Sequence, residues 1–326
     1  MPILSKVIRG EFIESIHVAY GVAVDEKGVV VYASGDPHYL TCIRSTCKPF
    51  QASAAVKSGA VDAAGFSEDE IALMCASHNG EDIHVKTAQS MLNKLGFTTD
   101  DYCCGSHLPY DIESNHVVIR SGNDPLPLHN NCSGKHAGML ALAKHLDQGI
   151  KGYIQKEHPV QKEIFNLVHE LTGLKNIPTE TDGCSAPTPF MTLETIARLF
   201  QKLAAGNNQK VSRVFDAMCA NPILVGGTNR FDSLFIEALA GRGITKIGGE
   251  SVRGISIKKP SGGSVGIALK VLDGNFRAMS IATMKLLEHL ELLNPVELEK
   301  LNKFRMKILR NHNQLEIGRI EAIVET

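Results

Sequence analysis

The chain has 326 residues, of which 43% are hydrophobic and 21% are charged, so its composition is that of an ordinary globular protein, neither disordered nor fibrous. Its 34 basic and 35 acidic residues nearly balance, and no basic block exceeds a pair, which excludes an electrostatic nucleic-acid site. No stretch approaches the roughly 18 apolar residues of a membrane-spanning helix. Charges between Lys6 and Glu14 interrupt any secretory signal, and we therefore expect a cytoplasmic protein.

The first segments predict a β-hairpin followed by a helix. Residues 18–36 contain two β-branched runs separated by residues 25–28, where Gly28 can take the positive φ of a tight turn. Residues 49–59 are rich in alanine and end at Gly59, a typical helix cap. We therefore expect a buried helix directly after residues 43–48.

Residues 67–240 are predicted to be mostly helical. Ser67 precedes Glu70 by three residues, which is the spacing of a capping box, and apolar residues recur every three or four positions over 155–173 and 188–204. Another helix is expected over 137–146. The segments 104–133 and 175–188 are rich in Gly, Asn, Pro and Ser and are predicted to be loops.

Strand character returns near the end of the chain, at 251–257, 264–283 and 316–324, with a second hairpin turn predicted at Asp273-Gly274. Strands at both ends and helices between them indicate an α+β fold, in which an antiparallel sheet from the N- and C-terminal strands packs against a helix-rich middle region. We expect residues 1–326 to form a single unit of two lobes with a cleft between them.

Ser45 and Lys48 are the first candidates for catalysis. Residues three apart on a helix share a face, so the lysine amine can lie beside the serine hydroxyl and, if burial and a second cation lower its pKa, accept the hydroxyl proton. Ser-x-x-Lys enzymes activate their nucleophile in this way. The alternative interpretation is an ordinary helix cap with a solvated lysine.

A second group of polar residues begins at Ser77 and continues with His78 and Asn79. It is either a simple capping turn or the second serine element of a Ser-x-x-Lys site. Such a site also needs a lysine followed by glycine on a strand beside the cleft. Lys246 fits this pattern, and Lys258 is the less favoured candidate.

The eight cysteines are expected to be reduced, either free or metal-bound, because the chain is large and lacks an export signal. Those among apolar neighbours are interpreted as small buried hydrophobic residues: Cys42, Cys75, Cys103 and Cys219. Cys132 and Cys184 lie in polar loops ahead of helices. Two thiols with a nearby nitrogen ligand suit zinc, and buried or reactive free thiols are the alternative.

Five motifs in this order resemble the thermolabile L-asparaginase family of the rhizobial type. They are RSTCKPFQA from Arg44, SHNGE from Ser77, HNNCSGKHAGML from His129, DGCSAPTPF from Asp182, and KIGGESV from Lys246, which is followed by GIALKVLDG. The resemblance implies hydrolysis of L-asparagine to L-aspartate and ammonia. It also implies a homodimer and a fold similar to serine β-lactamases, penicillin-binding proteins and serine-dependent glutaminases.

The resemblance assigns a role to each matching residue. Ser45 is implied to be the nucleophile with Lys48 as its base, and Ser77 and Lys246 a second Ser-Lys pair. It further implies a zinc ion on Cys132, Lys135 and Cys184, which assists substrate binding. The predicted substrate-binding residues are Arg44, His78, Asn79, His136 and Asp182, of which Asp182 is implied to lie beside the zinc ligands and hold a water or the substrate amine.

Two departures and two rival functions remain open at this stage. The family pattern Lys-x-Gly-Ala-Glu-Gly is replaced from Lys246 by KIGGES, so that Ser251 stands where the pattern has glycine, and Lys258 remains the alternative lysine. By spacing alone, His136 could replace Lys135 as a metal ligand. The rival functions are an amidohydrolase or glutaminase in which zinc activates the attacking water, and a non-catalytic amino-acid sensor on the same fold.

Overall fold

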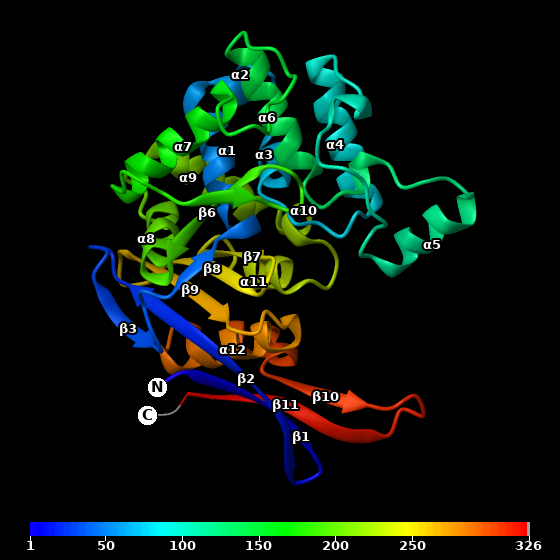
Figure 1. Ribbon diagram of the computed structural model, residues 1–326. Coiled ribbons are helices and arrows are strands. Elements are labelled where there is room, and N and C mark those ends of the chain that lie inside the picture. Colours follow the sequence, from blue (N-terminus) through cyan, green and yellow to red (C-terminus); the bar gives the residue numbers. More distant parts are fainter. Residues whose placement is uncertain (325–326) are drawn as a thin grey trace.

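A computed structural model describes residues 1–324 and shows a large antiparallel sheet with a helix-rich region above it (Figure 1). The eight-stranded sheet has the order β10-β11-β1-β2-β9-β8-β7, and β3 pairs with β2. Its strands are β1 (Ile3–Arg9), β2 (Phe12–Val24), β3 (Val30–Ser34), β7 (Gly243–Gly248), β8 (Val252–Lys258), β9 (Ser264–Val271), β10 (Met306–Arg310) and β11 (Glu316–Val324). A three-stranded sheet, β4-β6-β5, contains β4 (Leu40–Cys42), β5 (Thr179–Thr181) and β6 (Pro187–Thr192).

Most helices lie in the sequence between β3 and β7, which are the last N-terminal strand and the first C-terminal strand of the large sheet. They are α1 (Lys48–Ser58), α2 (Ala60–Ala63), α3 (Glu68–Met74), α4 (Asp82–Leu95), α5 (Ile112–Ser121), α6 (Ser133–His145), α7 (Pro159–Thr172), α8 (Leu193–Ala204), α9 (Gln209–Ala220), α10 (Pro222–Gly226), α11 (Phe231–Leu239), α12 (Phe276–His289) and α13 (Pro295–Lys300). Short 3-10 turns are η1 (Arg44–Cys47), η2 (Thr99–Asp101), η3 (Pro127–His129) and η4 (Asn302–Phe304). The α+β prediction is confirmed, because β1 pairs with β11 and brings the two ends of the chain together.

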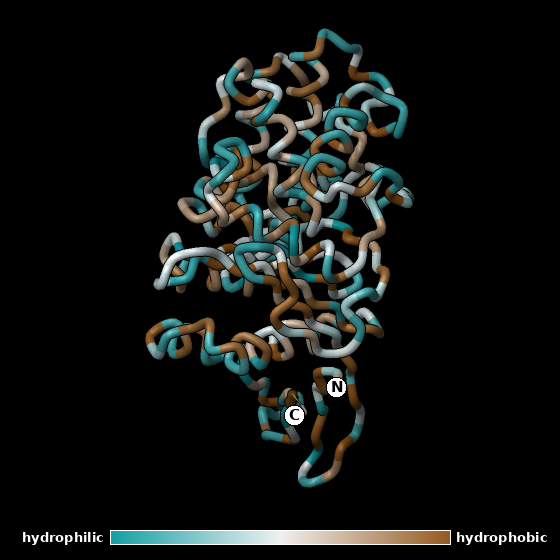
Figure 2. Tube along the Cα trace, turned by 90° about the vertical axis from the view of Figure 1, so that its left-hand side faces the viewer, coloured by the Kyte–Doolittle hydropathy of each residue, from teal (hydrophilic) through white to brown (hydrophobic). Residues whose placement is uncertain are grey.

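Helices cover both faces of the large sheet. Helix α8 packs on β8 and β9, while α12 packs on β1, β9 and β11. Close contact with α8 requires glycine, because a Cβ at Gly266 would lie 2.0 Å from the carbonyl oxygen of Ala197. Hydrophobic stretches run through the strands and the helix-rich region (Figure 2), and the buried residues form two clusters, one under each layer of helices.

Several local predictions are confirmed. Strands β2 and β3 form the expected hairpin, and Gly28 at its turn has φ of +75°. Helix α1 ends at Gly59, which has φ of +88°. Ser67 and Glu70 form the predicted capping box of α3. Each of these signals depends on residues close together in the sequence, which explains why the sequence pattern was sufficient to find them.

The predicted hairpin turn at Asp273-Gly274 is wrong. Strand β9 ends at Val271, and the turn leads into α12 rather than into another strand. The side chain of Asn275 caps this helix by accepting a hydrogen bond of 3.1 Å from the backbone of Arg277. The strand predicted over 264–283 is therefore half strand and half helix.

The loop and helix boundaries in the middle of the chain also need correction. The segment 188–192, predicted as helix, belongs to β6, because Pro187 and Pro189 disfavour a continuous helix there. The predicted loop 175–188 contains β5, and the predicted loop 104–133 contains α5. Asp111 caps α5 by accepting a hydrogen bond from the backbone of Ser114.

The turn between β7 and β8 is strained and has a compensating hydrogen bond. Glu250 and Ser251 have φ of +58° and +53°, values that cost non-glycine residues roughly 1–2 kcal/mol. The buried Ser251 hydroxyl donates a 2.9 Å hydrogen bond to the carbonyl oxygen of Gly274. This bond offsets part of the strain at a position where the resembling family has glycine.

Ser251 therefore provides a test of stability. We expect Ser251→Ala to lower the free energy of unfolding by about 1 kcal/mol, because it keeps the strain and loses the hydrogen bond. Ser251→Gly should change it by less than about 0.5 kcal/mol, since relief of strain compensates for the lost bond and for the greater freedom of the unfolded chain. Urea unfolding measures both values, and equal losses in the two variants would contradict this explanation.

Candidate active site

A pocket of about 670 Å³ lies where the helix-rich region meets the large sheet. It is lined from the helix-rich side by η1, by the loops around residues 77, 107–110 and 130–132, and by the loop before β6, and from the sheet side by the end of β7 and the start of α11 and α12. Its lining includes these candidate residues: Arg44, Ser45, Ser77, Cys132, Asp182 and Cys184.

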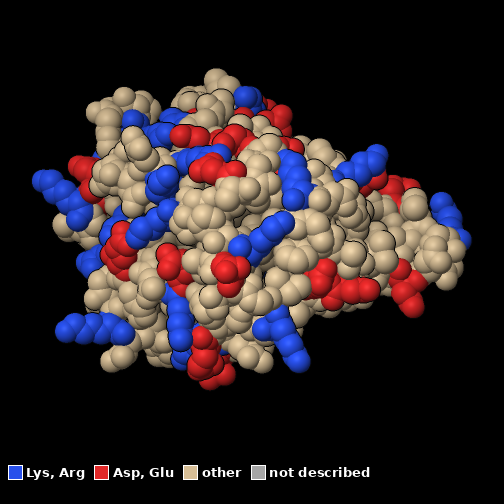
Figure 3. Space-filling model, turned by 90° about the horizontal axis from the view of Figure 1, so that it is seen from above, with Lys and Arg blue, Asp and Glu red and all other residues tan. Residues whose placement is uncertain are grey.

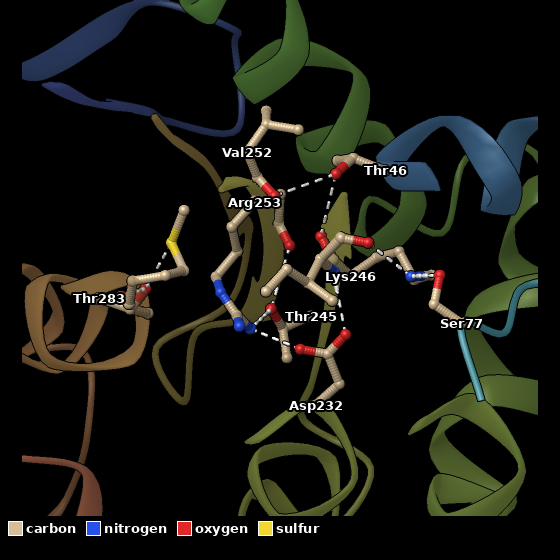
Figure 4. A network of polar contacts seen from close by, with 11 residues as sticks. Thr46, Ser77, Asp232, Thr245, Lys246, Val252, Arg253 and Thr283 are labelled. Carbon is tan, nitrogen blue, oxygen red and sulfur yellow. Dashed lines mark hydrogen bonds and ion pairs between the residues drawn. The ribbon is translucent and has the colours of Figure 1, made fainter. Parts of the chain in front are cut away.

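The Ser77 hydroxyl lies between two lysine amines. Its oxygen is 2.7 Å from Nζ of Lys246 and 3.1 Å from Nζ of Lys48. Figure 4 shows Ser77 pointing toward Lys246 from the opposite side of the site. Lys246 comes from β7 and Lys48 from the first turn of α1, so the fold brings three of the four predicted catalytic residues together.

Lys246 is suited to accept a proton. Burial lowers its pKa to about 7, and the nearby positive charge of Lys48 acts in the same direction, whereas Asp232 and Cys132 oppose the shift. Its amine also donates a 2.6 Å hydrogen bond to the carbonyl oxygen of Ile247. A neutral amine held by this bond keeps its lone pair available to the Ser77 hydroxyl.

Lys48 is fully buried and its amine is surrounded by oxygen atoms. It donates hydrogen bonds to the carbonyl oxygens of Ala76 and Asn131, the latter at 3.1 Å, in addition to Ser77. Within residues 1–324, these bonds reach Ser77 and two carbonyls rather than Ser45. Ser45 and Lys48 therefore lie near one another at the pocket but have no direct hydrogen bond. Lys48 instead bonds to Ser77.

Ser45 lies on a sharp turn between a strand and a helix. Strand β4 ends at Cys42, and η1 begins at Arg44, which has a φ of +51° and directly precedes Ser45. Thr46, the next residue, is buried, and its hydroxyl lies 3.3 Å from the carbonyl oxygen of Lys246 (Figure 4). A strained strand-to-helix turn is a common means of presenting a nucleophilic serine to a pocket.

Arg44 and Asp182 form an ion pair on the pocket wall through Nε and Oδ1. Burial opposes ionisation of Asp182, but the charges of Lys135 and Arg44 hold its pKa below the usual range. A free arginine at this place would suit a carboxylate ligand. Because Asp182 already pairs with the guanidinium through Nε, Arg44 presents a neutralised pair to the pocket.

Cys132, Lys135 and Cys184 are gathered at one end of the site. All three are buried, and Nζ of Lys135 lies 2.7 Å from Sγ of Cys184. A hydrogen bond from Cys184 holds the pKa of Cys132 well below its usual range, with help from the charges of Lys48 and Lys135. Within residues 1–324, no group of three or more His, Cys, Asp or Glu residues is placed to hold a metal, so any metal here depends on the lysine.

Three predicted substrate-binding residues lie outside the pocket lining. His78 is fully buried, stacks on His84 and contacts the Ser133 hydroxyl at 2.9 Å. Asn79 binds the carboxylate of Glu81 within the same motif. These side chains support the loops around the pocket, and burial holds the pKa of His78 well below its usual range, so its ring is neutral.

His136 is also buried away from the pocket lining. Its Nδ1 lies 2.6 Å from the hydroxyl of Tyr153, and burial lowers its pKa well below the usual range. Lys258, the alternative to Lys246, lies over the ring of Phe215 and 3.5 Å from the carboxylate of Asp216. The geometry thus favours Lys246 over Lys258 as the partner of Ser77.

The sequence interpretation missed a buried ion pair that positions β7. Asp232 accepts a 2.6 Å hydrogen bond from Nη1 of Arg253 and a 2.9 Å bond from the backbone of Ile247 (Figure 4). Arg253 also donates to the Thr245 hydroxyl at 2.8 Å. These bonds fix the strand on both sides of Lys246. The run TNRFD, which follows the glycine pair at 226–227 and is polar apart from Phe231, was the available signal in the sequence.

The remaining cysteines are only partly as predicted. All eight are free thiols. Cys75 is buried as expected, whereas Cys42, Cys103 and Cys219 are half-buried. Cys42 and Cys219 lie at or near the ends of β4 and α9, and Cys103 lies in the loop after η2. Burial raises the pKa of Cys75 to about 12, so this thiol is protonated and inert at neutral pH.

The predictions about charge and about membrane-spanning helices can be compared with the structure. In Figure 3 the acidic and basic side chains are intermixed on the face shown, in keeping with the balanced charge of the sequence. Among the helices of residues 1–324, none is long and apolar enough to cross a membrane.

Comparisons with solved structures give distant similarities. A β-lactamase from Sphaerobacter thermophilus is 14% identical with a TM-score of 0.44, and the match covers 86% of this chain and 93% of that one. The structure of PBP-A is 13% identical with a TM-score of 0.42, and the match covers 85% of this chain and 91% of that one. A Bacillus glutaminase is 14% identical with a TM-score of 0.39, and the match covers 84% of this chain and 91% of that one. A search of the curated proteins finds no match.

The sequence itself matches one protein family over nearly its whole length. Residues 5–322 match the family described as L-asparaginase II. This span includes the pocket lining, both lysines that bind Ser77 and the buried thiols. The chain therefore belongs to the L-asparaginase II family, and it is a hydrolase that acts on amides.

Proposed function

We propose that the protein is an L-asparaginase that hydrolyses L-asparagine to L-aspartate and ammonia through an acyl-enzyme on Ser45. The observation that carries this proposal is the Ser77 hydroxyl, which is bonded to the amines of both Lys48 and Lys246 beside the pocket that Ser45 lines. A serine is a weak nucleophile at neutral pH and needs a base. The neutral Lys246 amine supplies one.

In the proposed reaction the Ser45 oxygen attacks the side-chain amide carbon of asparagine. The Ser45 proton passes to the Ser77 oxygen as the Ser77 proton passes to the Lys246 amine, and Lys48 holds the Ser77 oxygen in place throughout. When the C–N bond breaks, the leaving nitrogen takes the proton from Lys246 and departs as ammonia. Water then hydrolyses the aspartyl ester, with the same amine accepting its proton and Ser45 recovering one.

One observation favours a second route. Ser77, rather than Ser45, makes direct hydrogen bonds to the amines, so Ser77 itself is the alternative nucleophile. We favour Ser45 because it follows a strained residue on a strand-to-helix turn and faces the pocket. Identification of the acylated serine separates the two routes.

Ammonia release tests the proposed activity. The purified protein is expected to release ammonia from L-asparagine, and comparison with L-glutamine measures its preference between two substrates that differ by one methylene group. No release from either would support the amino-acid sensor. The homodimer and the cytoplasmic location remain predictions.

The zinc proposal rests on the chemistry of the donors. Two buried sulfur atoms and one nitrogen, from Cys132, Cys184 and Lys135, are a donor set that suits Zn²⁺. Without a metal, Lys135 has a raised pKa because its neighbours Cys184 and Cys132 outweigh the effect of burial, so metal binding must displace a proton from it. When bound, zinc would supply a positive charge that helps to bind and orient substrate.

The kinetics of thiol variants test this role. We expect Cys132→Ser and Cys184→Ser to raise KM and largely retain kcat, because they remove binding that is similar in the ground and transition states. Metal analysis of the same samples shows whether zinc has been lost. A kcat that falls by orders of magnitude in folded, zinc-depleted protein would favour the rival in which zinc activates the attacking water.

The dependence of kcat/KM on pH follows from Lys246. Its pKa is lowered to about 7, so the amine is protonated below that pH and neutral above it. Because the neutral form is the base, kcat/KM for asparagine is expected to rise with pH through about 7 and then level off. A pH–rate profile on the free enzyme checks this, and activity that instead falls as pH rises through that range would contradict the role of Lys246.

A further inference from the structure

Three arginines line the pocket, and their partners differ. Arg44 is paired with Asp182, and Arg253 is paired with Asp232. Within residues 1–324, Arg230 has no carboxylate within ion-pair distance and no side-chain hydrogen bond, although it is half-buried at the pocket wall. A guanidinium in such a place has its planar set of donors available to a ligand.

The loop that carries Arg230 is held in a defined position. The carboxylate of Glu81 accepts hydrogen bonds of 2.7 Å from both the backbone N–H and the hydroxyl of Thr228. Asn79 donates to the same carboxylate at 2.9 Å and to the Thr228 carbonyl oxygen at 3.3 Å. Gly227 has φ of +109°, and a Cβ there would lie 2.5 Å from the Glu81 carboxylate, so the loop passes close to this clamp. The Asn79–Glu81 clamp fixes the backbone two residues before Arg230.

Arg230 also lies on the side of the pocket where the chemistry takes place. It immediately precedes α11, whose second residue, Asp232, binds the backbone beside Lys246. Its charge is near enough to Lys246 to contribute to the lowering of that residue's pKa. The positive charge of Arg230 adds to the cost of protonating Lys246. An anionic group of a ligand would neutralise this charge on Arg230.

We propose that Arg230 binds the α-carboxylate of the amino-acid substrate. The inference rests on the proposed asparaginase function and names the residue that recognises one end of the substrate. Arg44 is less suited, because Asp182 already neutralises it, and Arg253 is committed to Asp232 in the buried pair. Glu81 is a positioning residue, since it acts on Arg230 through Thr228.

The test compares L-asparagine with 3-aminopropanamide, which is asparagine without its α-carboxylate. We expect Arg230→Met to raise KM for asparagine by roughly 30-fold or more, because it removes charge-assisted hydrogen bonds to the carboxylate. The inhibition constant of 3-aminopropanamide against asparagine hydrolysis should change less than about threefold, since this compound cannot use Arg230. Comparison of the two ligands cancels any effect that passes through the pKa of Lys246.

Matched variants complete the experiment. Arg230→Lys keeps the charge without the planar fork and should lie between wild type and Arg230→Met. Glu81→Gln should raise KM for asparagine by a smaller factor and leave the inhibition constant unchanged. Arg120→Met, which alters an exposed arginine on α5, should have no effect on either ligand.

The outcomes distinguish a failure of the proposed asparaginase function from a failure of the proposed role of Arg230. A wild-type protein that releases no ammonia from asparagine overturns the proposed function. An active wild type whose KM for asparagine is unchanged in Arg230→Met overturns the role of Arg230 alone. Equal weakening of asparagine and 3-aminopropanamide would also overturn it, because the damage would then not depend on the α-carboxylate.

Discussion

Ser45→Ala is expected to lower kcat for asparagine hydrolysis by roughly 10³-fold or more, because it removes the oxygen that forms the acyl-enzyme. The substitution deletes one hydroxyl at a half-buried turn, so the fold should remain intact. Ser58→Ala is the matched control, since Ser58 lies at the far end of α1 and bonds only to local groups. Steady-state kinetics with an unfolding curve on both variants measures the effect. A fall in kcat of less than about tenfold, or roughly 1.4 kcal/mol of barrier, would rule out Ser45 as the nucleophile.

Lys246→Met is expected to cost about 10²- to 10⁴-fold in kcat/KM, because it removes the general base. The same variant should lose the rise in activity through pH 7, since the titrating amine is gone. Lys258→Met provides the control, because Lys258 was the alternative lysine and contacts Phe215 and Asp216 outside the pocket lining. Equal losses in the two lysine variants would contradict the assignment of Lys246, and so would a pH profile in Lys246→Met that matches wild type.

Local sequence signals were sufficient to single out the serines and lysines that the structure places in or beside the pocket. Lys48 follows Ser45 at helical spacing, and Ser77 opens a polar run at the end of a helix, so both were visible as motifs. The hydrogen bonds among them were not predictable. Lys48 bonds to Ser77 instead of Ser45, because two separate loops, one with Ala76 and one with Asn131, supply the carbonyl acceptors that orient its amine.

The sequence analysis did not identify residues whose place at the pocket depends on contacts between distant parts of the chain. Arg230 and Asp232 reach the pocket through a loop held by Glu81, which is 147 residues from its partner Thr228. No spacing rule connects such positions. In contrast, Asn79 was predicted to touch substrate but is part of the support for that loop, because its amide faces Glu81 and Thr228. The polar motif that begins at Ser77 thus has one member that lines the pocket and another, Asn79, that supports a neighbouring loop.

The fold class followed from the distribution of strand and helix patterns, whereas individual boundaries depended on tertiary contacts. Pairing of β6 with β4 and β5 turns part of a predicted helix into strand. The turn at Asp273 has the composition of a hairpin but is followed by α12, whose residues pack on the far face of the sheet. Whether residues 276–283 form a strand or a helix is decided by their packing against this face of the sheet, which the local sequence does not reveal.

Identification of the acylated residue is the most direct test of the account. The enzyme is mixed with asparagine, quenched rapidly in acid and digested with trypsin, which cuts after Arg44 and Lys57 and places Ser45 and Ser77 in different peptides. The account predicts an aspartyl ester on the peptide containing Ser45, and its absence from Ser45→Ala. An ester on the Ser77 peptide instead, in wild-type protein, would contradict Ser45 as the nucleophile.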